Sequence, residues 1–110
     1  MEATKRRKFS FEEIFGNEKH VKILVILSSK RRTRSRSKAA KLRQAESFGY
    51  LKKRTNVSKE TLKNYLHVLV TSGFIQEIES EGETLYRFFF ESAKGKALKK
   101  LFRLFHLRDD

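Results

Sequence analysis

The fold is decided by the stretch from Thr55 to Ile75, which reads T-N-V-S-K-E-T-L-K-N-Y-L-H-V-L-V-T-S-G-F-I. Ser58 can cap a helix, because its hydroxyl accepts a hydrogen bond from an unpaired amide of the first turn. Gly73 marks the end of this helix, since a residue without a Cβ adopts a left-handed conformation at little cost. We therefore predict a helix over residues 58–72. Its apolar stripe, which should face a core, consists of Leu62, Leu66 and Leu69 with Tyr65 and Val70 on the flanks.

The opposite side of this predicted helix is polar. It carries side chains of the kind that bond to base edges or phosphates. The candidates for such contacts are Ser58, Lys59, Thr61, Lys63, Asn64 and His67. Asn64 is the best candidate for reading a base, because an amide can make two hydrogen bonds to adenine.

The stretch resembles the recognition helix of winged helix-turn-helix proteins, in which a tight turn and a capped helix lead into a β-hairpin. Asn56-Val57-Ser58 match the turn and cap, and Gly73-Phe74-Ile75 match the exit into the hairpin. Thr61-Leu62, Leu66 and Leu69 match the buried positions. An ordinary amphipathic helix with a good cap carries the same signals, so the rest of the chain has to decide between the two.

A short helix is expected near the N-terminus. Ser10 and Glu13 have the spacing of a capping box, and Phe9 and Ile14 have the spacing of a hydrophobic staple. We expect this helix to stop at Gly16.

A second helix should follow, with Asn17 as its cap and little polar surface, so that it lies at the centre of the core. The run 14–17 followed by 21–24 is similar to the opening of many archaeal winged-helix regulators. The resemblance to winged-helix proteins therefore covers the opening of the domain as well as the recognition helix and its exit. The resemblance implies an archaeal-type winged helix-turn-helix regulator with MarR/ArsR-type architecture.

Composition favours a nucleic-acid partner. The chain has 110 residues, enough for one domain with a modest core, and a formal net charge of +13 with a pI near 10.3. Such a charge on a small domain attracts polyanions. A membrane partner is disfavoured, because no apolar run approaches the roughly 18 residues needed to span a bilayer.

Several classes of site are not expected. There is no cysteine, and the three histidines lie on different segments without ligand spacing, so we predict no metal site. No nucleophile with a placed base and no glycine cradle is apparent, so we expect no enzyme, no cofactor and no small-molecule ligand. The first residues lack the apolar region of a signal peptide, which predicts an intracellular protein of the cytoplasm or nucleoid.

Two basic stretches stand out. Residues 1–8 form a basic arm, either a solvated tail or a DNA contact. Residues 30–43 form a basic insert where most winged helices have a short connection; a solvated loop is the alternative, but the charge favours phosphate contacts. Its candidate phosphate ligands are Arg31, Arg32, Arg34, Arg36, Lys38, Lys41 and Arg43.

Residues 38–54 have helical composition, and the sequence leaves open whether they form one helix or two broken near residues 47–49. The second helix of the motif is expected over residues 48–54. Lys52, Lys53 and Arg54 at its end lie next to the recognition helix in sequence, where they could contact backbone phosphates and set its register in a groove.

Residues 74–80 and 84–90 are expected to form a hairpin, the wing, around Glu81-Gly82-Glu83. Its charge is unusual for a DNA-binding wing. The acidic residues, which a phosphate backbone would repel, are Glu77, Glu79, Glu81 and Glu83. We predict that the wing tip does not enter DNA; it either stays solvated, repels nucleic acid, or meets a basic surface of a partner or second subunit.

The last segment, 92–110, is expected to be helical. Ser92, Gly95 and Leu98 resemble the T-x-x-G-x-x-L start of the last helix in many winged-helix regulators, with serine in place of threonine. The helix carries a wide apolar stripe, which predicts a homodimer contact or packing against the first helices. The residues predicted for dimerisation are Leu98, Leu101, Phe102, Leu104 and Phe105.

The predicted fold class is mainly α with a small β-hairpin (α+β): a basic arm over 1–8, a winged helix-turn-helix domain over 9–91 and a C-terminal helix over 92–110. The predicted function is a double-stranded-DNA-binding transcription regulator, a homodimer with two recognition helices in successive major grooves. The alternatives are a non-specific architectural or chromatin-type DNA-binding protein and a protein-interaction winged helix in a larger complex. RNA binding is less favoured, because no exposed aromatic motif is apparent.

Overall fold

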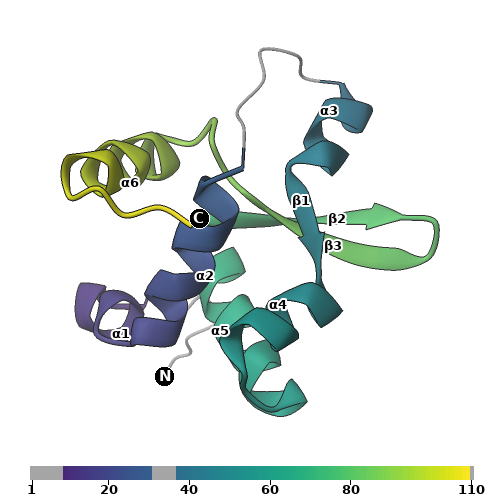
Figure 1. The fold of residues 1–110 in the computed structure, drawn as a ribbon, viewed down its shortest axis with the longest axis horizontal. Helices are drawn as coiled ribbons and strands as arrows, with labels where there is room; N and C mark the ends of the chain where they lie inside the picture. The colour runs from purple at the N-terminus through teal and green to yellow at the C-terminus, as the bar shows by residue number, and fades with distance from the viewer. Residues whose placement is uncertain (1–8, 31–36, 110) are drawn as a thin grey trace, which may run out of the picture.

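A computed structural model of the protein describes residues 9–30 and 37–109. Within this part of the chain, helices and a three-stranded sheet form one α+β unit (Figure 1). The elements are α1 (Phe11–Phe15), α2 (Glu18–Ser28), α3 (Lys38–Arg43), β1 (Ala45–Ser47), α4 (Phe48–Thr55), α5 (Lys59–Thr71), β2 (Ile75–Ser80), β3 (Glu83–Phe88) and α6 (Ala93–Leu104). The predicted fold class is confirmed.

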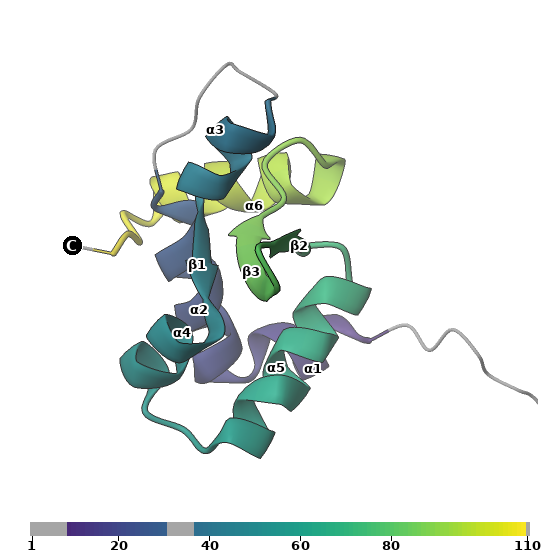
Figure 2. The ribbon, with the colours of Figure 1, turned by 90° about the vertical axis from the view of Figure 1, so that its right-hand side faces the viewer.

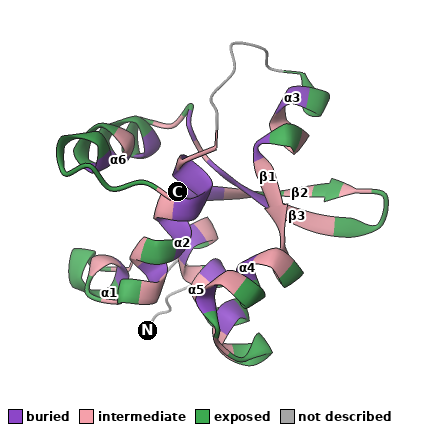
Figure 3. Ribbon diagram, viewed as in Figure 1, coloured by how far each residue is buried: buried purple, intermediate pink, exposed green. Residues whose placement is uncertain are grey.

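Helix α2 lies at the centre of the molecule, as its apolar sequence predicts. It contacts α1, α4, α5 and β3, and its middle is buried on most sides (Figure 3). Burial of apolar side chains supplies most of the driving force for such packing. The core residues with the least exposure are Ile23, Leu24, Leu27, Ala40, Leu51, Leu62, Leu69 and Phe88.

The N-terminal helix signals are confirmed. Ser10 and Glu13 form the capping box, with a 3.1 Å bond from the Glu13 amide to the Ser10 hydroxyl and a 2.8 Å bond from the Ser10 amide to the Glu13 carboxylate. Gly16 follows the last residue of α1. Asn17 caps α2 by accepting a 2.9 Å bond from the Lys19 amide.

Helices α4 and α5 form the expected helix-turn-helix. Asn56 ends α4 in the left-handed conformation (φ 55°), and Ser58 caps α5 by accepting a hydrogen bond from the Thr61 amide. Gly73 is left-handed (φ 85°) after the end of α5, as predicted. The Phe74 amide bonds to the Leu69 carbonyl at 3.1 Å, which turns the chain into the hairpin.

The segment between the basic insert and α4 differs from the prediction. Residues 38–54 form two helices, and residues 45–47 between them are a strand, β1, so the sheet has the order β1-β3-β2 rather than being a hairpin alone. Glu46 lies opposite Tyr86 in this pairing. Three residues carry no readable strand period, and their conformation is imposed by the long-range partner β3.

The hairpin itself is confirmed, with strands shorter than predicted. Glu81 and Gly82 both have positive φ (52° and 79°), as a two-residue type I′ turn requires. The third residue of the predicted turn, Glu83, begins β3 and pairs with Ser80.

Helix α6 begins where predicted, with Ser92 as its cap. A Cβ on Gly95 would lie 2.0 Å from the Phe89 carbonyl oxygen, so the glycine is required by a close backbone approach. The expectation that one apolar stripe forms a dimer contact needs correction. Leu98 and Phe102 are buried in the core of their own chain, and only Leu101, Leu104 and Phe105 of the predicted five are exposed.

Candidate nucleic-acid interface

Helix α5 presents a polar outer face. Lys59, Lys63, Asn64 and His67 are all exposed, while Leu62, Leu66 and Leu69 on the other side are buried. The helical period separates the two sets, because residues three and four apart share a face. Figure 2 shows α5 at the lower edge of the molecule, on the side away from α3.

Ser58 and Thr61 are already engaged with each other. The Ser58 hydroxyl accepts from the Thr61 amide at 3.2 Å and donates to the Thr61 hydroxyl at 2.8 Å. Thr61 is half-buried. These two residues therefore hold the start of α5 in place, which leaves four of the six predicted contact residues with their side chains fully on the outer face.

His67 has a neighbour that the sequence did not indicate. Its ring meets the edge of Phe9 at a centroid distance of 6.4 Å and an interplanar angle of 90°. Phe9, which precedes α1, therefore lies beside the polar face of α5. Phe9 also packs on the core, which fixes this end of the chain.

The basic end of α4 divides into two parts. Lys52 and Lys53 are exposed. Arg54, predicted as a phosphate ligand, instead forms an ion pair with Asp109 and donates to the Tyr50 hydroxyl at 2.7 Å. The hydrogen bonds from Arg54 hold the pKa of the Asp109 carboxyl below its usual value, so the pair is ionised at neutral pH.

The C-terminal segment reaches Arg54 because α6 is capped and turned back. His106 has positive φ (57°), and the Leu107 amide bonds to the Phe102 carbonyl at 2.8 Å. This is the pattern of a Schellman cap, with histidine in the position that glycine usually takes. The Asp109 amide then bonds to the Ser29 hydroxyl at 2.8 Å.

The described part of the basic insert lies away from α5. Helix α3 contacts β1 and β3, and in Figures 1 and 2 it is at the opposite end of the molecule from α5. Lys38 and Arg43 are exposed and Lys41 is half-buried. Lys30, the first residue of the insert, forms an ion pair with Glu46 on β1. Four of the predicted phosphate ligands lie outside the described residues: Arg31, Arg32, Arg34 and Arg36.

A buried guanidinium that sequence reasoning missed holds α3 to the sheet. Arg87 on β3 is only 1% exposed. It donates to Gln44 at 2.6 Å, to Gln76 at 2.5 Å and to both carboxylate oxygens of Glu91 at 3.0 and 3.1 Å. The signal in the sequence was a single charge between apolar neighbours, Tyr86 before it and Phe88 after it, and strand alternation places its side chain on the face opposite Tyr86.

The acidic residues of the hairpin are exposed where the sequence places them. Glu77 and Glu79 lie on β2, and Glu81 and Glu83 lie at its turn. Glu79 accepts a 2.6 Å bond from the Thr84 hydroxyl across the hairpin. Within a strongly basic chain, this hairpin is a local surface of negative charge.

Within residues 9–30 and 37–109, no group of three or more histidine, aspartate or glutamate side chains is placed to hold a metal ion. The helices of the same ranges are all too short or too polar to cross a membrane.

A helix-turn-helix packed on a small sheet whose last two strands project as a hairpin defines the winged helix class of folds. The chain has a similar fold to HlyU from Vibrio cholerae N16961, with a TM-score of 0.59, 22% sequence identity and 86% of each chain covered. No protein-family model and no curated protein matches the sequence.

Proposed function

We propose that the protein binds double-stranded DNA as a transcription regulator and places α5 in the major groove. The observation that carries this proposal is the outer face of α5, where Lys59, Lys63, Asn64 and His67 are exposed together on one capped helix. Such a face supplies both base-reading and phosphate-binding groups to a groove wide enough for a helix.

Phosphate contacts next to α5 are assigned to Lys52 and Lys53. Both are exposed on the helix that precedes the turn. Arg54 contacts a phosphate of the DNA only when its ion pair with Asp109 is broken. The exposed cations of α3 serve a more distant part of the duplex or a second one, because α3 and α5 are at opposite ends of the molecule.

A homodimer suits this function. Leu101, Leu104 and Phe105 of α6 are 44%, 68% and 67% exposed, and Phe11 of α1 is 71% exposed. The three exposed side chains of α6 offer an apolar surface to a second copy, and exposed apolar patches of this kind tend to mark interfaces. A two-fold dimer would present two α5 helices to half-sites about 34 Å apart.

The second candidate function is a non-specific architectural DNA-binding protein. The net charge of +13 and the separate basic surface of α3 favour it. It predicts steep salt dependence with little dependence on sequence.

Selection of bound duplexes from a random-sequence pool at about 150 mM salt tests the proposal, because non-specific affinity is much reduced there. We expect an enriched palindrome with half-sites about one helical turn apart. A pool that stays random while it still binds would favour the architectural candidate. Absence of binding would overturn both and leave the protein-interaction role.

A further inference from the structure

Strand β2 is the edge of the sheet that the described residues form, in the order β1-β3-β2. In a two-residue hairpin, the residues that close the turn are a hydrogen-bonded pair, and pairs along the strands then alternate. Ser80 and Glu83 close this turn. Glu77 and Glu79 are therefore in non-hydrogen-bonded pairs, and their backbone N–H and C=O groups point away from β3 toward the open edge.

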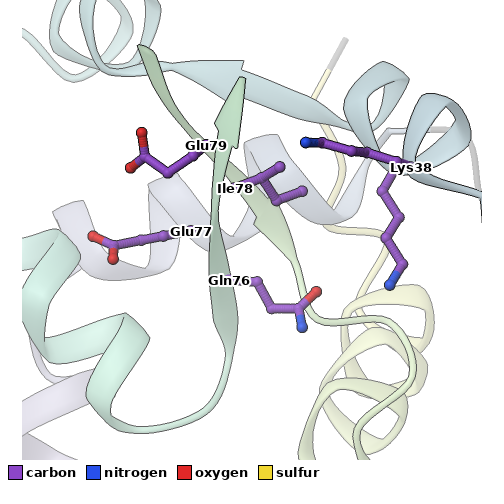
Figure 4. Close-up of a pocket in the computed structure, with 6 residues that line it drawn as sticks. Lys38, Gln76, Glu77, Ile78 and Glu79 are labelled. Atoms are coloured by element: carbon purple, nitrogen blue, oxygen red, sulfur yellow. The ribbon is translucent and has the colours of Figure 1, made fainter. Parts of the chain in front are cut away.

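The two faces beside this edge carry opposite charges. Glu77 and Glu79 are exposed and point to one side of β2, while Ile78 points to the other side, toward Lys38 of α3 (Figure 4). A groove of about 510 Å³ follows the strand, lined by Lys38 and Lys41 from α3 and by residues 76–79. Side chains of a strand added here would alternate between the two charged faces.

We propose that β2 is a docking edge for an extended segment of another protein in which basic and acidic residues alternate. The segment adds to the sheet as a further strand and bonds to the outward backbone groups of Glu77 and Glu79. Its basic side chains meet the two carboxylates on one face, and its acidic side chains meet Lys38 and Lys41 across the groove. Main-chain bonds supply affinity and the charge alternation supplies specificity, as in other cases of strand addition.

Charge disfavours two other occupants of this edge, a second copy of β2 and a phosphate backbone. Two copies of β2 paired with each other would place Glu77 and Glu79 against the same residues of the second copy, and like charges opposite one another destabilise a strand pair. A phosphate backbone would meet the same carboxylates. Charged side chains on an edge strand also suppress indiscriminate pairing. The two glutamates of β2 and the two lysines of α3 therefore disfavour most extended segments and favour one with complementary charges.

The probe is a synthetic peptide of about ten residues, the length of a long strand, in which arginine and glutamate alternate. Its net charge is close to zero, so the overall charge of the protein does not drive binding. The control peptide has the same composition with arginine and glutamate in separate blocks. Binding to the ¹⁵N-labelled full chain is followed by amide chemical shifts at about 150 mM salt, where long-range attraction is screened.

We expect the alternating peptide to shift the amides of residues 77–79 and to bind at least about tenfold more tightly than the block peptide. Equal binding of the two peptides, or shifts confined to other residues, would overturn the proposal. A peptide methylated on the backbone nitrogens that face β2 should also lose binding, since it cannot donate to the strand. If it kept full affinity, the contact would be electrostatic and strand addition would be refuted.

Charge-reversal variants localise the contact. Glu77→Lys with Glu79→Lys should abolish binding of the alternating peptide, and Lys38→Glu with Lys41→Glu should do the same from the other face. Glu81→Lys with Glu83→Lys is the matched control, because it makes the same charge change at the turn, beyond the groove lining. Thermal unfolding of each variant checks the fold. A control variant that lost binding equally would contradict the assignment.

Discussion

Helix α5 and the hairpin are held to the same core by different means and face solvent with opposite charge. Three leucines anchor α5, and its exposed side chains include two lysines, an amide and an imidazole beside one carboxylate, Glu60. The hairpin is anchored partly by the buried guanidinium of Arg87, and its exposed face is acidic. A chain with a net charge of +13 thus keeps one surface that attracts polyanions and one that repels them. Net charge identifies the class of partner, while local charge decides which surface meets it.

The largest effect is expected from substitution of Arg87, which tests how the hairpin is anchored. Arg87→Ala removes the buried guanidinium that bonds to Glu91, Gln44 and Gln76 and truncates a fully buried side chain, so we expect a loss of about 2–5 kcal/mol in the free energy of unfolding. Chemical denaturation measures it. Arg87→Met removes the charge but keeps much of the volume, and it should cost less. If both variants unfolded like the wild type, the buried network would not hold the hairpin and α3.

The second prediction concerns base reading by α5. Asn64→Ala should relax base preference at one position of the site, at a cost of about 1–3 kcal/mol for the preferred base. Neutralising Arg31, Arg32, Arg34 and Arg36 together should weaken binding to all sequences and flatten the salt dependence. Selection from a random pool and salt titrations measure the two effects. Changed preference in the arginine variant with none in Asn64→Ala would reverse these roles.

The third prediction contrasts the two surfaces directly. The affinity for DNA falls as salt rises, and Lys59→Gln with Lys63→Gln should make this fall less steep. The magnitude of the slope of log affinity against log salt should decrease by about one for each lysine that contacts a phosphate. Glu81→Gln with Glu83→Gln should leave the slope unchanged, because the wing tip is predicted to stay out of the duplex. Fluorescence anisotropy over a salt series distinguishes the two variants. A steeper slope after the glutamate changes would place the tip at the DNA.

The smallest effect concerns the Arg54–Asp109 pair. The pair is partly exposed, so Asp109→Asn should cost at most about 1 kcal/mol at neutral pH. Because the folded pKa of Asp109 is lowered, its contribution is present above the unfolded pKa and lost as the pH falls through the folded one. The difference between variant and wild type in thermal unfolding should therefore vanish in strong acid. A difference that persisted there would point to a cause other than the charge.

The same variant also affects DNA binding by the α4–α5 unit. Asp109→Asn frees Arg54 to bond to a phosphate, so affinity at low salt should rise modestly and the slope should steepen by up to about one. An unchanged slope would show that Arg54 does not face the duplex.

Local signals predicted most of the fold. The caps Ser10, Asn17 and Ser58 and the stop at Gly73 were readable because each involves a side chain or backbone conformation within a few residues. The start of α6 at Ser92 was expected from its resemblance to the last helix of winged-helix regulators. The outer face of α5 was readable for the same reason, since the helical period alone separates Asn64 from Leu62. Strand β1 was not readable, because its three residues become a strand only by pairing with β3.

The candidate site was predictable only in part. Exposure of Lys59, Lys63, Asn64 and His67 follows from the helix, but the capture of Arg54 by Asp109 joins residues 55 positions apart. The split of the α6 stripe into buried Leu98 and exposed Leu101 depends on how that helix meets the core.

What the sequence by itself determined is the set of helices, the turn between α4 and α5, the hairpin, and the basic character of the chain, because short-range hydrogen bonds and periodicity encode them. Tertiary structure alone decided that α3 lies far from α5, that Arg87 is buried against three polar partners, and that β2 lies at the edge of the sheet that the described residues form. The physical reason is that burial and pairing depend on neighbours distant in the chain, which no local pattern specifies.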